Sequence, residues 1–466
     1  MGYILALLLL ILSFWVFLQR GERKILPFFI FAICLSGVSV SAYPQTIINI
    51  HVFFFLSLLL CWKSFYRSFN KTILWWLMLL MLIATTLLWL HSPNFQGPSG
   101  ALRLFKTELI EKYLVICYAF FIFKNRNCLH KILTVSFYCL IVLTFFGLIN
   151  LLLGHSIFVD WALEGAELNE VTQDAGGKYE LAERFRVMAM HPNPFSYGYI
   201  CVVMLLLFLY GKDRGSVNKL EFYTSLFCCL FGIVACGCRT IVVIAFGGFM
   251  VYYTLTRGVR KSVLFYVAGV LLIVLILSVS PSAAEKFNFF LTIFDDRSNV
   301  SGSSDLNMRS RQLAAVLLYI QNDPLYGLGK DYFYLDMDWA SGNSRDAELH
   351  GMEGVYLNLL LERGFIGLFF YVLFWIVLTI KFFISRKKDY QAVAFALSVI
   401  AAYLVFAIMT GELNSTFTTL LLCGLALADI DRNETIVPKR KRKKVAVPQI
   451  SKVTKDETIS NSNTSI

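Results

Sequence analysis

Several arginines of this 466-residue chain stand beside turn or helix-start signals, where a guanidinium group could bind an anion. Arg184 and Arg186 shortly precede a Pro-Asn pair that ends at Asn193 and begins an apolar run. A guanidinium offers donors in a fixed fork to a phosphate, and a helix N-terminus adds a partial positive charge. Arg239 lies in a polar Gly-Cys-Arg-Thr break between two apolar runs. The alternatives are interfacial snorkelling for Arg184 and Arg186 and an ion pair for Arg239.

A second arginine group follows later in the chain. Arg309 and Arg311 begin an amphipathic stretch that ends in a turn-rich Pro-Leu-Tyr-Gly-Leu-Gly sequence starting at Pro324. Because the two arginines are two residues apart, a helix points them to different faces. The spacing therefore predicts that only one of the two enters a shared site.

A candidate base lies beyond this turn. His350 and Glu353 are three residues apart, so a helical turn would place them on one face. A histidine or carboxylate at the mouth of a membrane helix suits general-base work, while the structural alternative is a pair that caps the helix. Tyr356 and Asn358 follow and, with Asn193, are possible sugar-binding residues; a packing role is also open for Tyr356 and Asn358.

This combination of arginines and a base occurs without a metal-binding motif or a cofactor motif. The sequence has no HExxH, CxxC or P-loop pattern, which removes the main support for a zinc protease or a nucleotide-driven pump. Such a set suits a lipid-linked pyrophosphate substrate. The arginines would neutralise the diphosphate leaving group, in place of a metal, while the base deprotonates a sugar hydroxyl. We therefore expect neither a metal nor a cofactor.

The elements that position these residues are predicted to be membrane helices. Hydrophobic residues make up 57% of the chain and charged residues 16%, which excludes most soluble proteins. Runs of roughly 17–25 apolar residues span a bilayer as helices. We predict an all-α polytopic membrane protein with about 12–13 transmembrane helices. The candidate spans are 2–18, 25–43, 46–62, 73–90, 108–123, 132–153, 195–210, 221–238, 240–255, 262–280, 365–384, 391–409 and 415–430.

The distribution of Lys and Arg predicts the orientation of these spans. Every second short loop is basic, and six consecutive basic residues run from Lys439 to Lys444, so these loops and the C-terminus are expected to face the cytoplasm. The tail also invites a nucleic-acid or anionic-lipid interpretation, but we expect a positive-inside anchor and no nucleic-acid partner. The long loops 154–190 and 281–352 then lie outside, and long loops usually carry function.

These observations divide the chain into six predicted regions. They are N-terminal transmembrane helices (1–153), a first periplasmic loop (154–194), central transmembrane helices (195–280), a large periplasmic loop with the catalytic motifs (281–364), C-terminal transmembrane helices (365–430) and a basic disordered tail (431–466).

The motifs resemble those of the O-antigen ligase/O-antigen polymerase family of bacterial envelope enzymes. The family's Arg followed nine residues later by Asn is matched by Arg184 and Asn193, and its Ser-Arg-Thr-like element by the break at Arg239. Its Arg fifteen residues before a Pro-x-x-Gly-x-Gly turn is matched by Arg309. The resemblance covers roughly 180–375. It implies a bacterial inner-membrane enzyme with a periplasmic site, a fold similar to membrane-embedded GT-C type glycosyltransferases, and undecaprenyl-diphosphate-linked glycans as substrates.

One departure from the family pattern bears on the reaction. Ligases of the family carry a His eleven residues before the first Gly of a Gly-x-x-Gly element, and counting back from Gly364 reaches Glu353. This favours an inverting polymerase that joins repeat units into O-antigen, capsule or exopolysaccharide, with Glu353 as first choice of base and His350 as second. A ligase acting on lipid A core or protein is the alternative within this chemistry.

A transporter or lipid-linked glycan flippase is the alternative from another class. Transporters commonly contain internal repeats, and no clear repeat relates the two halves of this chain. The resemblance implies the lipid bilayer and lipid-linked glycans as binding partners, with a chain-length regulator and a flippase as further candidates.

Overall fold

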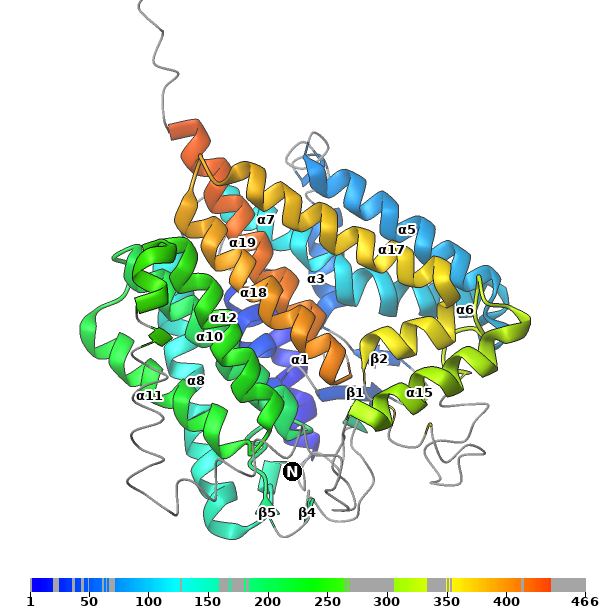
Figure 1. Cartoon of the computed structure of the whole chain (residues 1–466), viewed down its shortest axis with the longest axis horizontal. Coiled ribbons are helices and arrows are strands. Elements are labelled where there is room, and N and C mark those ends of the chain that lie inside the picture. Colours follow the sequence, from blue (N-terminus) through cyan, green and yellow to red (C-terminus); the bar gives the residue numbers. More distant parts are fainter. Residues whose placement is uncertain are drawn as a thin grey trace, which may run out of the picture.

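The computed structural model describes most of the chain. The larger described stretches are residues 2–19, 25–35, 50–60, 72–125, 128–158, 184–264, 306–332, 354–411 and 415–436, with shorter pieces between them. The helices form one bundle, and the N-terminus lies beside it (Figure 1).

Six helices among the described residues are long and apolar enough to cross a membrane. Each coincides with a run that the sequence predicts to be a span, and together they support an all-α polytopic membrane protein. They are α5 (Ile73–Leu90), α8 (Leu129–Leu153), α10 (Pro194–Asp213), α12 (Arg239–Arg257), α17 (Val355–Ser385) and α18 (Tyr390–Met409).

The predicted span 262–280 lies almost entirely outside the described residues. Further helices among the described residues complete the bundle. The remaining helices are α1 (Gly2–Leu18), α2 (Ile25–Ile30), η2 (Phe31–Leu35), α3 (Ile50–Leu59), η3 (Pro93–Phe95), α6 (Gly97–Phe105), η4 (Lys106–Tyr113), α7 (Val115–Asn125), α11 (Lys219–Ala235), α15 (Leu306–Tyr319), η6 (Ile320–Asn322) and α19 (Ser415–Ile436).

Two predicted spans are helical over only part of their length, and their neighbouring ends form strands. Residues Val38–Ala42 form β1 and Thr46–Ile48 form β2, paired antiparallel, so the predicted spans 25–43 and 46–62 are wrong at these ends. The Val-Ser-Val-Ser alternation has the period of a strand, and Pro44 between the strands favours a turn. β1 also pairs with β3 (Glu167–Leu168), while β4 (Glu180–Leu181) pairs with β5 (Arg184–Phe185).

The core of the bundle lies around α10, α18 and α19. α12 packs along α18, α19 packs along α7, and α10 contacts α11, α12 and α18. The three helices α10, α18 and α19 are buried over most of their length. Hydroxyl groups within this core hydrogen-bond one another, as between Tyr199 and Thr419 at 2.5 Å and between Tyr403 and Thr416 at 2.7 Å. Internal pairing of this kind is what a low-dielectric interior requires of its polar groups.

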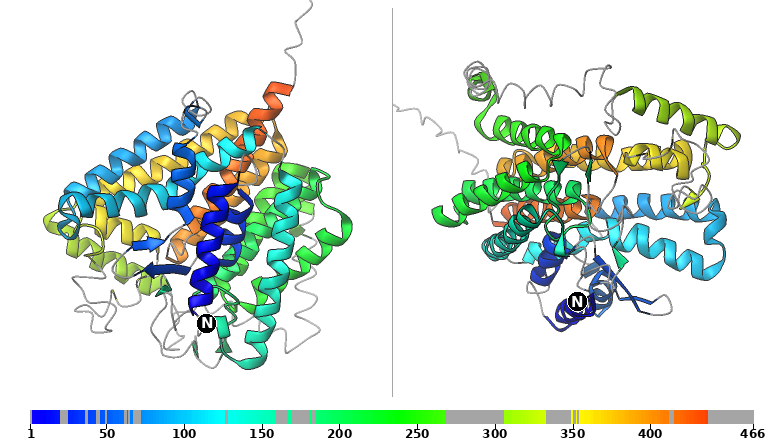
Figure 2. Two further views of the ribbon diagram at one scale, coloured as in Figure 1. Left: turned by 180° about the vertical axis from the view of Figure 1, so that it is seen from behind. Right: turned by 90° about the horizontal axis from the view of Figure 1, so that it is seen from below.

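The helices α12 and α18 run antiparallel, which fixes the two ends of the bundle. Tyr252 near the end of α12 and Gln391 at the start of α18 both donate hydrogen bonds to Asp213, at 2.9 Å and 3.2 Å. The start of α12, which carries Arg239, therefore lies at the same end as the last turn of α18. Figure 2 shows the bundle from two further sides.

Candidate functional site

The helix α17 is interrupted one third of the way along. Gly364 has φ 58° and ψ −163°, which is not helical, and the predicted span start at 365 falls directly after it, whereas the helix itself begins at Val355. A break in a helix leaves carbonyl and amide groups without their intrahelical partners. In a membrane these groups need other partners.

The Pro-x-x-Gly-x-Gly turn that follows α15 provides those partners. The amides of Leu328 and Gly329 donate to the carbonyls of Leu361 and Glu362 at 2.9 Å and 3.0 Å. In the reverse direction, the amides of Phe365 and Ile366 donate at 2.9 Å and 3.0 Å to the carbonyls of Pro324 and Leu325, respectively. We call this arrangement of residues 324–329 around Gly364 the interlock.

The interlock explains why glycines occupy these positions. A Cβ on Gly364 would lie 2.5 Å from the main chain of Leu325, and one on Gly327 would lie 2.6 Å from the amide nitrogen of Gly364. Both glycines also have positive φ, a conformation that strains other residues. The second glycine of the turn, Gly329, packs in the same way against Pro93 and His91. The turn is therefore wedged between α17 and the loop after α5.

A buried ionic network surrounds the interlock. Arg363 donates to Glu108 of η4 at 2.5 Å, and Lys330 donates to both carboxylate oxygens of Glu362 at 3.2 Å and 3.1 Å. Lys330 is also 4.0 Å from Glu108, so the four side chains form one connected set. The amide of Asp331 adds a further hydrogen bond to Glu362 at 3.1 Å. Removing one member would leave its partner charged and buried, which is costly.

Lys330 remains protonated within this network. Burial by itself lowers the pKa of the Lys330 amine, but the carboxylates of Glu362 and Glu108 outweigh it and hold the pKa above its usual value. Its main-chain amide donates to Ser92 Oγ at 2.9 Å. Lys330 thus joins the turn both to α17 and to the end of α5.

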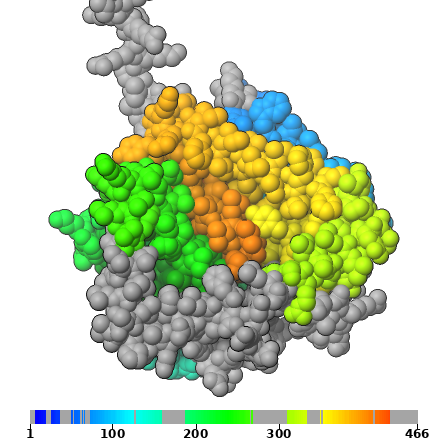
Figure 3. Space-filling view, in the orientation of Figure 1, coloured from blue at the N-terminus to red at the C-terminus, as the bar shows by residue number. Residues whose placement is uncertain are grey.

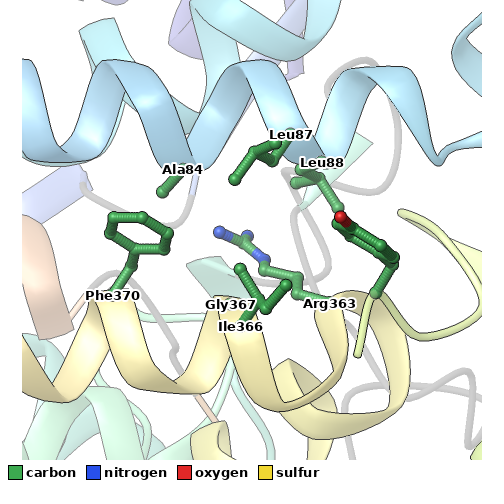
Figure 4. Close-up of a pocket in the computed structure, with 8 residues that line it drawn as sticks. Ala84, Leu87, Leu88, Arg363, Ile366, Gly367 and Phe370 are labelled. Atoms are coloured by element: carbon green, nitrogen blue, oxygen red, sulfur yellow. The ribbon is translucent and has the colours of Figure 1, made fainter. Parts of the chain in front are cut away.

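Arg363 also lines a small cavity between α5 and α17 (Figure 4). The cavity measures about 10 Å³, room for about one water molecule. Its walls are apolar side chains of both helices, and Arg363 extends from α17 toward α5. The Arg363 Nε atom is buried without a hydrogen-bond partner. Tyr326 of the turn also lines the cavity, and its ring stacks on that of His91 with centroids 3.7 Å apart.

The helix α15 lies on the first part of α17 (Figure 3). A small apolar cluster joins them, and it includes Leu349 and Met352, which directly precede the candidate bases His350 and Glu353 in the sequence. Arg309 of α15 donates to the side chain of Gln312 and to the carbonyl of Met409, both at 3.0 Å. The main chain at Gly354 meets the same last turn of α18, since a Cβ there would lie 3.3 Å from the Ile408 carbonyl. Arg309 and the residue after Glu353 are therefore neighbours of one helix end.

Arg186 and Arg239 come together at the turn between α11 and α12. The Arg186 side chain lies against this turn, since a Cβ on Gly237 would be 3.3 Å from Arg186 Cγ, and its positive charge acts on that of Arg239. Arg186 approaches the Cys238 sulfur at 3.9 Å and lies over the Phe195 ring at 6.0 Å. An anion bound between two positive charges weakens their mutual repulsion.

The segment that carries Arg186 is anchored on both sides. The amide of Val187 donates to the carbonyl of Ala235 at 3.2 Å, and Asn150 of α8 hydrogen-bonds the main chain of Ala189. Asn193 then caps α10, its side-chain oxygen accepting from the Ser196 amide at 2.8 Å. His191 is fully buried between these anchors, and burial lowers its pKa to about 4.

The sequence-predicted residues differ in how far the structure describes them. His350, Glu353 and the side chain of Arg184 lie outside the described residues. Arg311 is exposed on α15 while Arg309 is half-buried, so the two point differently, as their spacing predicts. Tyr356 is half-buried with its ring against Tyr371 at 5.6 Å. Asn358 is half-buried in the first turn of α17.

The sequence interpretation did not assign a role to the ionic network. Glu108 and Arg363 are 255 residues apart, and no local pattern connects them. One signal was available, because adjacent charges such as Glu362-Arg363 at the edge of an apolar run are costly unless they are paired. That signal indicates partners without naming them.

The arginine side chains described at this end of the bundle are chemically suited to bind an anion. Three arginines, Arg186, Arg239 and Arg309, come from three separate segments, and the interlock fixes the turn that follows the helix of Arg309. No curated protein matches the chain. Residues 224–372, which include Arg239, Arg309 and the whole interlock, match the family model described as O-Antigen ligase. This part of the chain is thus similar to the O-antigen ligase family, and it lies on a helical membrane fold.

Proposed function

We propose that this protein polymerises undecaprenyl-diphosphate-linked repeat units into O-antigen, capsule or exopolysaccharide. The family match supports glycan transfer by a ligase or polymerase. The proposed site rests mainly on one observation. Arg309 and Gly354 come from different motifs, and both contact the last turn of α18. The start of α12 with Arg239 lies at this end of the bundle as well.

In this mechanism the chain's own side chains provide the catalysis. Arg239 and Arg309, with Arg186, Arg184 and Arg311 in support, hold the diphosphate of the growing chain. Glu353, or His350, takes the proton from a hydroxyl of the incoming repeat unit. That oxygen then bonds to the reducing-end C1 as the bond from C1 to the phosphate oxygen breaks. The arginines stabilise the charge that develops on the leaving diphosphate, and a single displacement inverts C1.

The proposed location follows from charge. The end of the bundle opposite Arg239 carries the basic residues of the short loops, such as Lys212, Arg257 and Arg386. The positive-inside rule places that end in the cytoplasm. The candidate site then faces the periplasm of a bacterial inner membrane, with the C-terminus inside.

A ligase is the second candidate, favoured by the description of the matching family. Envelope glycans from a deletion strain, complemented with wild type, Arg239→Ala or Glu353→Gln, distinguish the two. A single repeat unit on its acceptor, with no ladder, supports the polymerase. Full-length glycan retained on the lipid carrier supports the ligase. Normal glycan in the deletion strain overturns both the polymerase and the ligase and favours the transporter alternative.

A further inference from the structure

The turn between α11 and α12 holds two cysteines separated by one glycine. Cys236 follows α11 and Cys238 precedes α12. Both side chains are buried, with exposures of 0% and 3%, and neither is in a disulfide. Gly237 between them has φ 64°, which turns the chain sharply enough to bring its two neighbours toward each other.

The two cysteines are in contact. Cys238 Sγ donates to the Cys236 carbonyl at 3.3 Å, and Cys236 Sγ donates to the Ile233 carbonyl at 3.1 Å. A disulfide needs Cα atoms about 4.4–6.8 Å apart. Two virtual bonds of about 3.8 Å joined at a tight turn fall in that range. The main chain therefore already has a spacing that a bridge permits.

A cation lies beside the sulfurs. Arg186 Nη1 is 3.9 Å from Cys238 Sγ, and the Arg186 charge also acts on Cys236. A neighbouring guanidinium favours the thiolate, which is the form that reacts with disulfides. Cys228 and Cys229, by contrast, lie within α11 on its buried face. They provide matched controls from the same helix.

We propose that Cys236 and Cys238 form a reversible thiol–disulfide site, with a small or protein disulfide as its oxidant. The Cys238 thiolate attacks one sulfur of the oxidant and expels a thiolate. The Cys236 thiolate then attacks the Cys238 sulfur and expels the second. The two cysteines lose two electrons and two protons, and the oxidant gains them as two thiols. Both side chains are buried, so exchange requires local opening of the turn and is slow.

The consequence for the site rests on the proposed function. Arg239 is the next residue after Cys238, and Arg186 contacts the Cys238 sulfur. An S–S bond between the sulfurs removes the thiolate that the Arg186 charge favours and constrains the turn that precedes Arg239. We expect diphosphate affinity to change by about tenfold, the effect of one charge-assisted hydrogen bond.

The chemical test needs no glycan-transfer assay. The full chain in lipid nanodiscs is equilibrated with glutathione at graded ratios of reduced to oxidised form, quenched in acid, denatured, alkylated and digested. Mass spectrometry should show Cys236 and Cys238 losing alkylation together, in a peptide lighter by two hydrogens, while Cys228 and Cys229 stay alkylated. The Cys236→Ser variant should instead trap a glutathione adduct on Cys238.

Two results would overturn the site. One is full alkylation of Cys236 and Cys238 at a ratio that oxidises an added model dithiol. The other is a bridge from Cys236 to a different cysteine, for example Cys201. A formed bridge with unchanged diphosphate affinity in wild type would reject only the consequence for Arg239. The Cys236→Ser/Cys238→Ser variant, whose affinity should not respond to glutathione, is the control for that measurement.

Discussion

The two ends of the bundle use their charges differently. At the basic end, each of several cations meets a carboxylate: Arg214 meets Asp389, Arg257 meets Asp213, and Arg432 meets Asp429. Tyr210 donates to Asp429 at 2.6 Å in the same network. At the opposite end, Arg309 meets a backbone carbonyl and Arg186 and Arg239 repel one another. The ion pairs described at the first end join opposite charges, whereas at the second end a bound anion would weaken the repulsion between Arg186 and Arg239.

The charged residues at the opposite end of the bundle form two groups. Arg363, Lys330, Glu108 and Glu362 neutralise one another around the interlock. These charges therefore stabilise the fold, whereas the arginines near α12 and α18 are the candidates for ligand binding. Substitutions in the two groups should separate stability from activity.

The largest effect is expected from Gly364→Ala. The new Cβ would lie 2.5 Å from the main chain of Leu325 and would strain a left-handed residue. We expect a loss of about 5 kcal/mol in the free energy of unfolding, in the range reserved for severe backbone or core defects. Thermal unfolding in detergent measures it. Gly247→Ala in α12 is the control, because a Cβ there meets nothing within 4 Å, and an equal loss there would contradict the interlock.

Next is Arg363→Met, which leaves Glu108 buried without its 2.5 Å partner. We expect a loss of about 3–5 kcal/mol in stability. The double variant Arg363→Met/Glu108→Gln should cost less than the sum of the single variants, because both remove the same pair. Additive losses in the same unfolding assay would show that the two side chains act independently.

Arg239→Ala should separate the two groups of charges. We expect kcat/KM for glycan transfer to fall about 100-fold, the effect of removing one donor to a developing charge, with little change in unfolding temperature. Arg257→Ala at the other end of the same helix is the matched control, since its ion pair with Asp213 is half-exposed and surface pairs contribute little. Equal activity of the two variants would remove Arg239 from the site.

The smallest of the four effects concerns pH. His191 has a pKa of about 4 in the folded chain because it is buried, against about 6.5 when unfolded. Unfolding therefore takes up a proton below pH 6.5, so this stability is complete above pH 6.5 and is lost as the pH falls toward 4. Between pH 7.5 and pH 5 the loss is about 2 kcal/mol. In His191→Phe this component of the pH dependence of unfolding should disappear, and its persistence would assign it to another group.

The spans and the interlock show how far the sequence alone could predict the fold. Length and apolarity predicted the six long helices, because a membrane helix must satisfy its own backbone. The same criterion failed at residues 38–42 and 46–48, where apolar residues alternate with serine or follow a proline turn and form strands. Hydropathy averages over a window and does not separate these periods.

The candidate site was predictable in part for a similar reason. Arg239 and Arg309 stand beside local breaks that a sequence displays. Lys330 and Glu108 stand beside no such break. Their roles depend on ion pairs across the bundle with Glu362 and Arg363. The spacing in the sequence predicted the motif with Gly327 and Gly329. Only the structure shows that this turn hydrogen-bonds the interrupted helix α17.

The interlock also has a consequence for how the chain is made. The turn at 324–329 precedes α17 in the chain, so it is synthesised before the helix whose break it fills. The exposed backbone groups around Gly364 can therefore meet their partner as soon as α17 leaves the insertion machinery, without waiting for α18 or α19. Reversing that order, as in a circular permutant that begins at Val355, would leave an incomplete helix in the membrane during synthesis.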